Sequence, residues 1–140
     1  MRILMLGNSF TSTNHMPDIL AKLTGAEVVQ HTRGGARLAE QLNPKTKMGK
    51  RTQEALQSQK WDFVILQEMS NGPISSKKSF LENAGKLCEQ IRENGAKPVF
   101  MRLGHISVKA RNWKLLGWIM MKCISKCMKL IIRQQRGIMR

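Results

Sequence analysis

The chain has 140 residues, a formal net charge of +15 at pH 7 and three cysteines. This length suits one domain with one core, and three cysteines are too few for a disulfide framework. No apolar run reaches the roughly 18 residues that a membrane span needs, and the N-terminal run is too short for a signal peptide. The sequence as written therefore indicates a cytoplasmic protein.

The positive charge is concentrated toward the C-terminus. Residues 1–101 hold 14 Lys+Arg and 9 Asp+Glu, a net of +5, whereas residues 102–140 hold 10 Lys+Arg and no acidic residue. The composition thus divides the chain into a domain over 1–101 and a basic tail over 102–140. Strong positive charge is a common footprint of nucleic-acid binding, but no recognition motif accompanies it, so we expect no specific nucleic-acid partner.

Strand and helix patterns alternate along residues 1–101. Short apolar runs predict buried strands at residues 2–6, 27–31, 62–66 and 98–101. Helical spacing predicts helices over the segment from Asn14 to Gly25 and over residues 47–58 and 78–94. This alternation predicts an α/β fold, a parallel sheet of four strands with helices on both faces.

Polar residues follow three of the expected strands, at the sheet edge where ligands bind in parallel sheets. They are Gly7-Asn8-Ser9, Gly34-Gly35 and Ser70-Asn71. A serine hydroxyl with converging backbone and amide donors is the set of groups that acyl transfer needs. The alternatives are a capping serine at Ser9 and simple turns at the other two places.

The segment ILMLGNSFT, which contains Ser9, resembles the first motif of the SGNH (GDSL-type) hydrolases. Asn8 stands where an Asp is commoner in that family, and this wording is similar to an uncharacterised subgroup that begins with GNSFT. Gly35 matches the second motif. In the third motif Asn71 falls on the family's Asn, while Met69 and Gly72 replace its Gly and Asp.

The resemblance implies a three-layer flavodoxin-like fold, with four parallel strands in the order 2-1-3-4 and a sheet that is incomplete at its C-terminal end. It also implies a serine esterase. It implies Ser9 as the nucleophile, with the backbone N–H groups of Ser9 and Gly35 and the amide of Asn71 as the oxyanion hole. Gly34 and Gln67 are secondary candidates for this site. The implied substrate is a small acyl ester, for example an acetylated carbohydrate, with no cofactor and no metal.

The family's general base is the His of an Asp-x-x-His motif near the C-terminus. His105 does not fit this motif, because position 102 is Arg. We interpret His15 and His31 as solvated surface histidines. Since a serine without its base is a poor nucleophile, we expect the chain as written to be inactive.

The tail over residues 102–140 has two interpretations. In the first it is a frameshift product. One shifted reading frame forces acidic codons at five junctions fixed by the single codons of Met and Trp, and the other shifted frame forces stop codons. In the second it is a genuine basic amphipathic helix, with cations such as Lys122 and Lys126 on one side, that binds an anionic membrane or a partner.

Overall fold

A computed structural model describes residues 1–101 of the chain, and the interpretation of residues 102–140 lies outside this part. The strands are β1 (Arg2–Gly7), β2 (Glu27–Thr32), β3 (Phe63–Leu66) and β4 (Lys97–Phe100). The helices are α1 (Ser9–Ser12), α2 (Met16–Thr24), α3 (Leu38–Leu42), α4 (Lys47–Ser58), α5 (Gly72–Ser75) and α6 (Lys77–Glu93), with a 3-10 turn at Thr13–His15.

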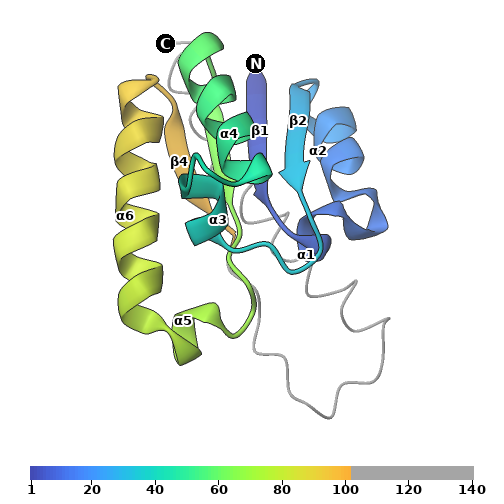
Figure 1. Cartoon of the computed structure of the whole chain (residues 1–140). Coiled ribbons are helices and arrows are strands. Elements are labelled where there is room, and N and C mark those ends of the chain that lie inside the picture. The colour runs from blue at the N-terminus through green and yellow to red at the C-terminus, as the bar shows by residue number, and fades with distance from the viewer. Residues whose placement is uncertain (102–140) are drawn as a thin grey trace. The chain divides into compact units, whose positions relative to one another are not determined.

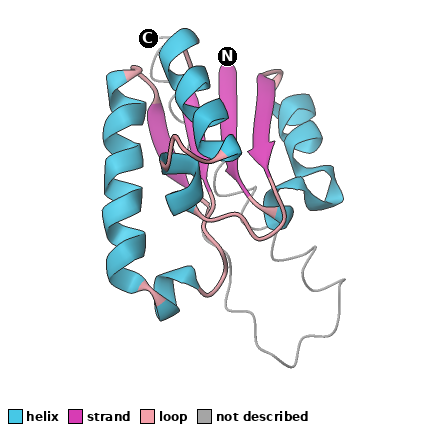
Figure 2. Ribbon diagram, viewed as in Figure 1, coloured by secondary structure: helices cyan, strands magenta, loops and turns pink. Residues whose placement is uncertain are grey.

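The four strands form one parallel sheet in the order β2-β1-β3-β4, which confirms the predicted topology (Figure 1). In this sheet Leu6 of β1 is in register with His31 of β2 and with Leu66 of β3. The carboxyl ends of the strands therefore meet at one edge. Figure 2 shows the loops after β1, β2 and β3 gathered at this edge.

Helices cover both faces of the sheet, as the strand order requires. Because β2 lies on one side of β1 and β3 on the other, right-handed crossovers place α2 on the face opposite to α3 and α4. One continuous apolar core lies between β1, β3 and the helices α3, α4 and α6. Its fully buried members are Leu4, Leu6, Leu38, Val64, Leu66, Leu87 and Ile91.

α4 and α6 lie within one residue of their predicted bounds, whereas α2 begins at Met16 and not directly after Asn14, because Thr13–His15 form a 3-10 turn before it. α4 coincides with the predicted residues 47–58, and its first turn is capped by Thr46, whose Oγ1 accepts the N–H of Gly49 at 2.9 Å. Gly25 ends α2 with a φ of 66°, a left-handed conformation that suits glycine. The three shortest helices, α1, α3 and α5, have no periodic signal of their own because each is only one turn or slightly longer.

The expectation that His31 is a solvated residue is wrong. Its side chain is buried, with a relative exposure of 4%, because β2 is covered by the α3–α4 segment. The Nδ1 atom of His31 has no hydrogen-bond partner among the described residues. His15 is exposed as expected and lies 3.3 Å from the carboxylate of Asp18.

Within residues 1–101, no helix is long and apolar enough to cross a membrane. The division of the chain into a domain over 1–101 and a tail over 102–140 stays a prediction, as does the frameshift interpretation of the tail.

Candidate active site

Ser9 lies directly after β1, as the first residue of α1, and it is exposed. Its backbone N–H and its Oγ donate no hydrogen bond to any of the described residues. Both groups are therefore available to a ligand at the carboxyl edge of the sheet. This is the placement that a nucleophile with its own backbone donor needs.

Asn8 fixes the start of α1 and joins it to the next loop. Its Oδ1 accepts the N–H of Phe10 at 3.1 Å, while its Nδ2 donates to the carbonyl of Ala36 at 3.2 Å. The side chain is buried, so both bonds are shielded from water. Asn8 thus holds the Ser9 segment against the loop that carries Gly35.

Gln67 holds the same segment from the β3 side. Its Oε1 accepts the N–H of Asn8 and the hydroxyl of Thr11, both at 2.9 Å, and its Nε2 donates to the carbonyl of Glu68 at 2.7 Å. Gly7 permits this packing, because a Cβ there would lie 2.3 Å from Thr11 Oγ1 and 2.7 Å from Gln67 Oε1. Gln67 therefore lies under the Ser9 turn and acts on its position.

Gly34 and Gly35 are the two central residues of a tight turn. The turn is closed by a hydrogen bond from the N–H of Ala36 to the carbonyl of Arg33 at 3.0 Å. Gly35 has a φ of 69°, and a positive φ at this position is the signature of a type II turn. The N–H of Gly35 donates to no group among the described residues, so it is available as an oxyanion donor.

Glu68 connects the loop after β2 with the loop after β3, a role that none of the three sequence motifs indicates. Its carboxylate accepts the N–H of Leu38 at 3.4 Å and the N–H of Met69 at 2.7 Å. Gly72 packs against it, since a Cβ there would lie 2.8 Å from Glu68 Cγ. The signal in the sequence is the acidic residue directly after Gln67, at the end of a buried strand.

Asn71 lies just before α5, and its side chain is exposed and makes no hydrogen bond to the described residues. Its carbonyl accepts the N–H and hydroxyl of Ser75. Hydrogen bonds thus join the Ser9 and Gly35 segments to each other and Gln67 to the Ser9 segment. No interaction of this kind connects the side chain of Asn71 to either segment, and its role as an oxyanion donor stays a prediction.

Within the described 101 residues there is no group of three or more His, Cys, Asp and Glu side chains that could hold a metal ion. Neither of the two histidines in this part bonds to Ser9: His15 pairs with Asp18, and His31 lies in the core beneath α3 and α4. The described part of the chain therefore supplies a serine and candidate donors at one edge, and neither of its histidines is bonded to that serine.

Comparison with solved structures places this arrangement among known proteins. The chain is 46% identical to a protein from Slackia heliotrinireducens assigned to the SGNH hydrolases, with a TM-score of 0.75, and the match covers 90% of this chain and 72% of that protein. The chain belongs to the SGNH hydrolase family. A lipolytic protein of the G-D-S-L family from Desulfitobacterium hafniense DCB-2 shares the fold, with 16% identity, a TM-score of 0.61, and coverage of 89% of this chain and 73% of that one.

Membership in the SGNH hydrolases agrees with the family resemblance of the three sequence motifs and with the α/β sheet. No protein-family model and no curated protein sequence matches the chain. The family identity therefore rests on the structural relative at 46% identity.

Proposed function

We propose that this SGNH hydrolase chain carries the nucleophile and oxyanion hole of a serine ester hydrolase, with Ser9 as the nucleophile. The observation that carries the proposal is that the N–H and hydroxyl of Ser9 and the N–H of Gly35 donate no hydrogen bond to residues 1–101. Asn8 joins the two segments through its bond to the Ala36 carbonyl. A nucleophile flanked by backbone donors suits the tetrahedral oxyanion of ester hydrolysis. The amide of Asn71 is the third proposed donor.

The proposed substrate is a small acyl ester, and within that class an acetylated carbohydrate. The exposed position of Ser9 suits a nucleophile reached from solvent. The cytoplasmic location stays a prediction. No cofactor has a part in this chemistry.

The test is hydrolysis of p-nitrophenyl acetate by the full chain, with and without added imidazole. The sequence holds no Asp-x-x-His motif, so we expect turnover barely above background without imidazole. Imidazole supplies the missing general base, and general-base catalysis contributes about 10²–10⁴-fold, so added imidazole should raise the rate above that of imidazole alone.

The variant Ser9→Ala should reduce the imidazole-dependent rate to that of imidazole alone. Ser12→Ala is the matched control, because Ser12 is an exposed serine of the same short helix. Equal rates for the wild type and Ser9→Ala would overturn the proposal. Robust turnover without imidazole that Ser9→Ala abolishes would keep Ser9 as the nucleophile and contradict the missing base, with His105 the first residue to replace.

A further inference from the structure

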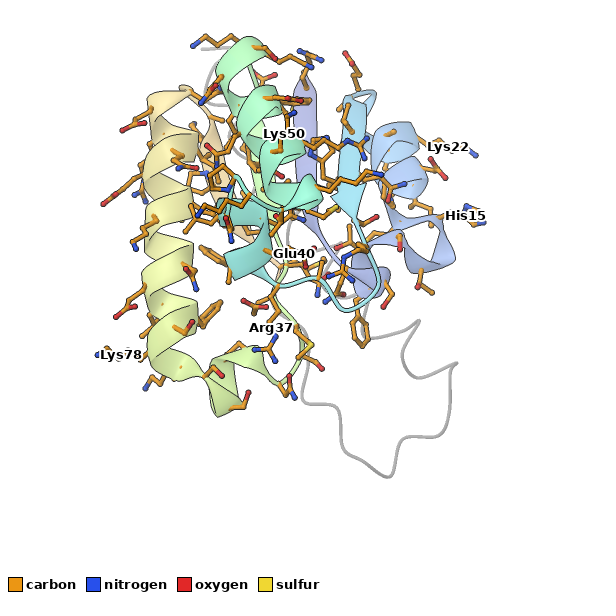
Figure 3. All side chains as sticks on the ribbon, viewed as in Figure 1. His15, Lys22, Arg37, Glu40, Lys50 and Lys78 are labelled. Atoms are coloured by element: carbon orange, nitrogen blue, oxygen red, sulfur yellow. The ribbon has the colours of Figure 1, made fainter. Side chains whose placement is uncertain are left out.

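A bidentate ion pair lies against the Gly34–Gly35 turn. The guanidinium of Arg33 donates from Nε to Glu40 Oε1 at 3.0 Å and from Nη2 to Glu40 Oε2. Its remaining nitrogen, Nη1, donates to the carbonyl of Gly34 at 2.9 Å. Figure 3 shows Glu40 on α3, with Arg37 at the start of that helix. Glu40 thus fixes the guanidinium, and the guanidinium in turn holds one carbonyl of the turn.

The bonded carbonyl belongs to the same peptide unit as the N–H of Gly35. In a trans peptide the C=O and the N–H point in opposite directions. The bond from Arg33 to the Gly34 carbonyl therefore directs the Gly35 N–H away from the guanidinium. This peptide is also the central one of the turn, and its rotation by about 180° is what distinguishes type I from type II turns.

Because the peptide lies between two glycines, it has little intrinsic preference for the type I or the type II orientation. Glycine has no Cβ and populates positive and negative φ about equally. A Cβ added at either Gly34 or Gly35 would have no neighbour within 4 Å, so side-chain packing around the turn does not fix the peptide. The hydrogen bond from Arg33 is the interaction that does so among the described residues.

We propose that Arg33 and Glu40 are positioning residues that hold the Gly34–Gly35 peptide in the orientation in which the Gly35 N–H serves as an oxyanion donor. This inference rests on the proposed role of Gly35. Glu40 orients Arg33, Arg33 binds the Gly34 carbonyl, and the peptide presents its N–H to the acyl oxygen. Neither side chain touches the substrate.

The chain offers a matched control for this pair. At the amino edge of the sheet, Arg2 makes the same two bonds to Glu27, with Nε–Oε2 and Nη2–Oε1 distances of 3.0 and 3.2 Å. That pair makes no hydrogen bond to the Gly34–Gly35 turn. Glu40→Gln and Glu27→Gln therefore each weaken one Arg–Glu pair, and only the first releases the peptide.

The experiment measures the rate at which a fluorophosphonate labels Ser9 in the full chain with imidazole as the base, followed by peptide mass mapping. Glu40→Gln should slow the labelling about tenfold, less than the ~100-fold or greater loss that follows complete removal of an oxyanion donor. Glu27→Gln should stay within about twofold of the wild type, because its pair lies away from the turn.

A rescue variant separates peptide orientation from a general loss of structure. Pro-Gly at the centre of a turn favours type II, and Gly34 has no positive φ and donates no hydrogen bond from its N–H to the described residues. Adding Gly34→Pro to Glu40→Gln should restore most of the labelling rate. In parallel, the carbonyl ¹³C shift of Gly34 should move in Glu40→Gln and stay unchanged in Glu27→Gln.

The outcomes separate this inference from the proposed function. Labelling of Ser9 that is equal in Glu40→Gln and Glu27→Gln would overturn the positioning role and leave Ser9 as the nucleophile. No labelling of Ser9 in the wild type would count against the proposed function instead. The ¹³C measurement does not depend on labelling, and an unmoved Gly34 carbonyl shift in Glu40→Gln would by itself refute the hold on the peptide.

Discussion

Asn8 occupies a position at which the family's commoner residue is Asp, and its hydrogen bonds explain why an amide serves here. One end of the side chain accepts from Phe10 and the other donates to Ala36. A carboxylate can make the first bond but lacks the donor for the second. The amide thus caps α1 and also joins the Ser9 segment to the Gly35 loop.

We expect that substitution of Gly7 lowers the stability of the folded chain. In Gly7→Ala, the new Cβ would lie 2.3 Å from Thr11 Oγ1 and 2.7 Å from Gln67 Oε1, so the Gln67 bonds beneath Ser9 must shift. We expect a loss of about 1–3 kcal/mol in the free energy of unfolding, measured by urea denaturation.

Gly85→Ala is the control for this substitution. Gly85 is exposed in α6, and a Cβ there meets nothing within 4 Å, so it should stabilise the protein by about 0.5–1 kcal/mol. If Gly7→Ala were as stable as the wild type, the close packing at Gly7 would be contradicted.

We expect that the buried His31 makes the folded chain less stable in mild acid. Burial, with a smaller contribution from the charge of Arg51, lowers the pKa of His31 from 6.5 to about 4. Between these values the unfolded chain binds a proton that the folded chain excludes, so stability falls as the pH drops from 6.5 toward 4. We expect the His31 contribution to be on the order of 1–2 kcal/mol at pH 5, measured by urea denaturation at pH 7 and pH 5.

His31→Leu should flatten this part of the pH dependence. His15→Gln, which removes the exposed histidine, should keep it. A steep pH dependence that survives in His31→Leu would show that other groups cause it.

At the scale of elements, Asn94 links the end of α6 to the segment between α4 and β3. Its Nδ2 donates to the carbonyls of Leu56 and Gln59, both at 2.6 Å, and its Oδ1 accepts the N–H of Trp61 at 3.2 Å. The side chain is buried, so these bonds replace water for three backbone groups. The ends of two helices and the entry to β3 are thus fixed by one residue.

Asn94→Ala should lower the free energy of unfolding by about 2–4 kcal/mol, because it leaves buried backbone groups without partners. Thermal or urea denaturation measures this loss. The control is Asn83→Ala, because within residues 1–101 the side chain of Asn83 bonds only to Ser79, on the same helix. Its effect should be within about 0.5 kcal/mol. Equal losses for the two variants would contradict the linking role.

At the scale of the whole molecule, the charge is divided unevenly, with +5 in residues 1–101 and +10 in residues 102–140. If the tail is a frameshift product, binding of the full chain to anionic vesicles depends on net charge alone. The double variants Lys122→Glu/Lys126→Glu and Lys50→Glu/Lys78→Glu each remove two positive charges and add two negative ones, so each lowers the net charge by four. We therefore expect them to weaken vesicle binding equally, in a sedimentation assay at increasing salt.

A loss confined to the tail variant, together with steep salt dependence, would favour the amphipathic-helix interpretation. In that case each cation near the anionic surface contributes about 1 kcal/mol. Lys50 and Lys78 suit the control because both are exposed on the described part of the chain (Figure 3).

Much of the fold could be predicted because its signals are local. The apolar run of β1, the periodic apolar face of α6 and the turn at Gly34–Gly35 each depend on neighbouring residues. The strand order 2-1-3-4 is implied by the family resemblance, and the handedness of the crossovers then decides which face each helix covers. The burial of His31 could not be predicted in this way, since it depends on the α3–α4 segment, which lies further along the chain.

The same distinction between local patterns and tertiary packing applies to the candidate active site. The sequence by itself determined the residue types at the carboxyl edge of the sheet, because Ser9, Gly35 and Asn71 follow strands whose ends must align in a parallel sheet. Only the tertiary structure decided how that edge is held together. The bonds of Asn8 to Ala36, of Gln67 to Asn8 and of Arg33 to Glu40 join residues 28, 59 and 7 positions apart. Such pairings arise when the strands and loops pack, and no local pattern encodes them.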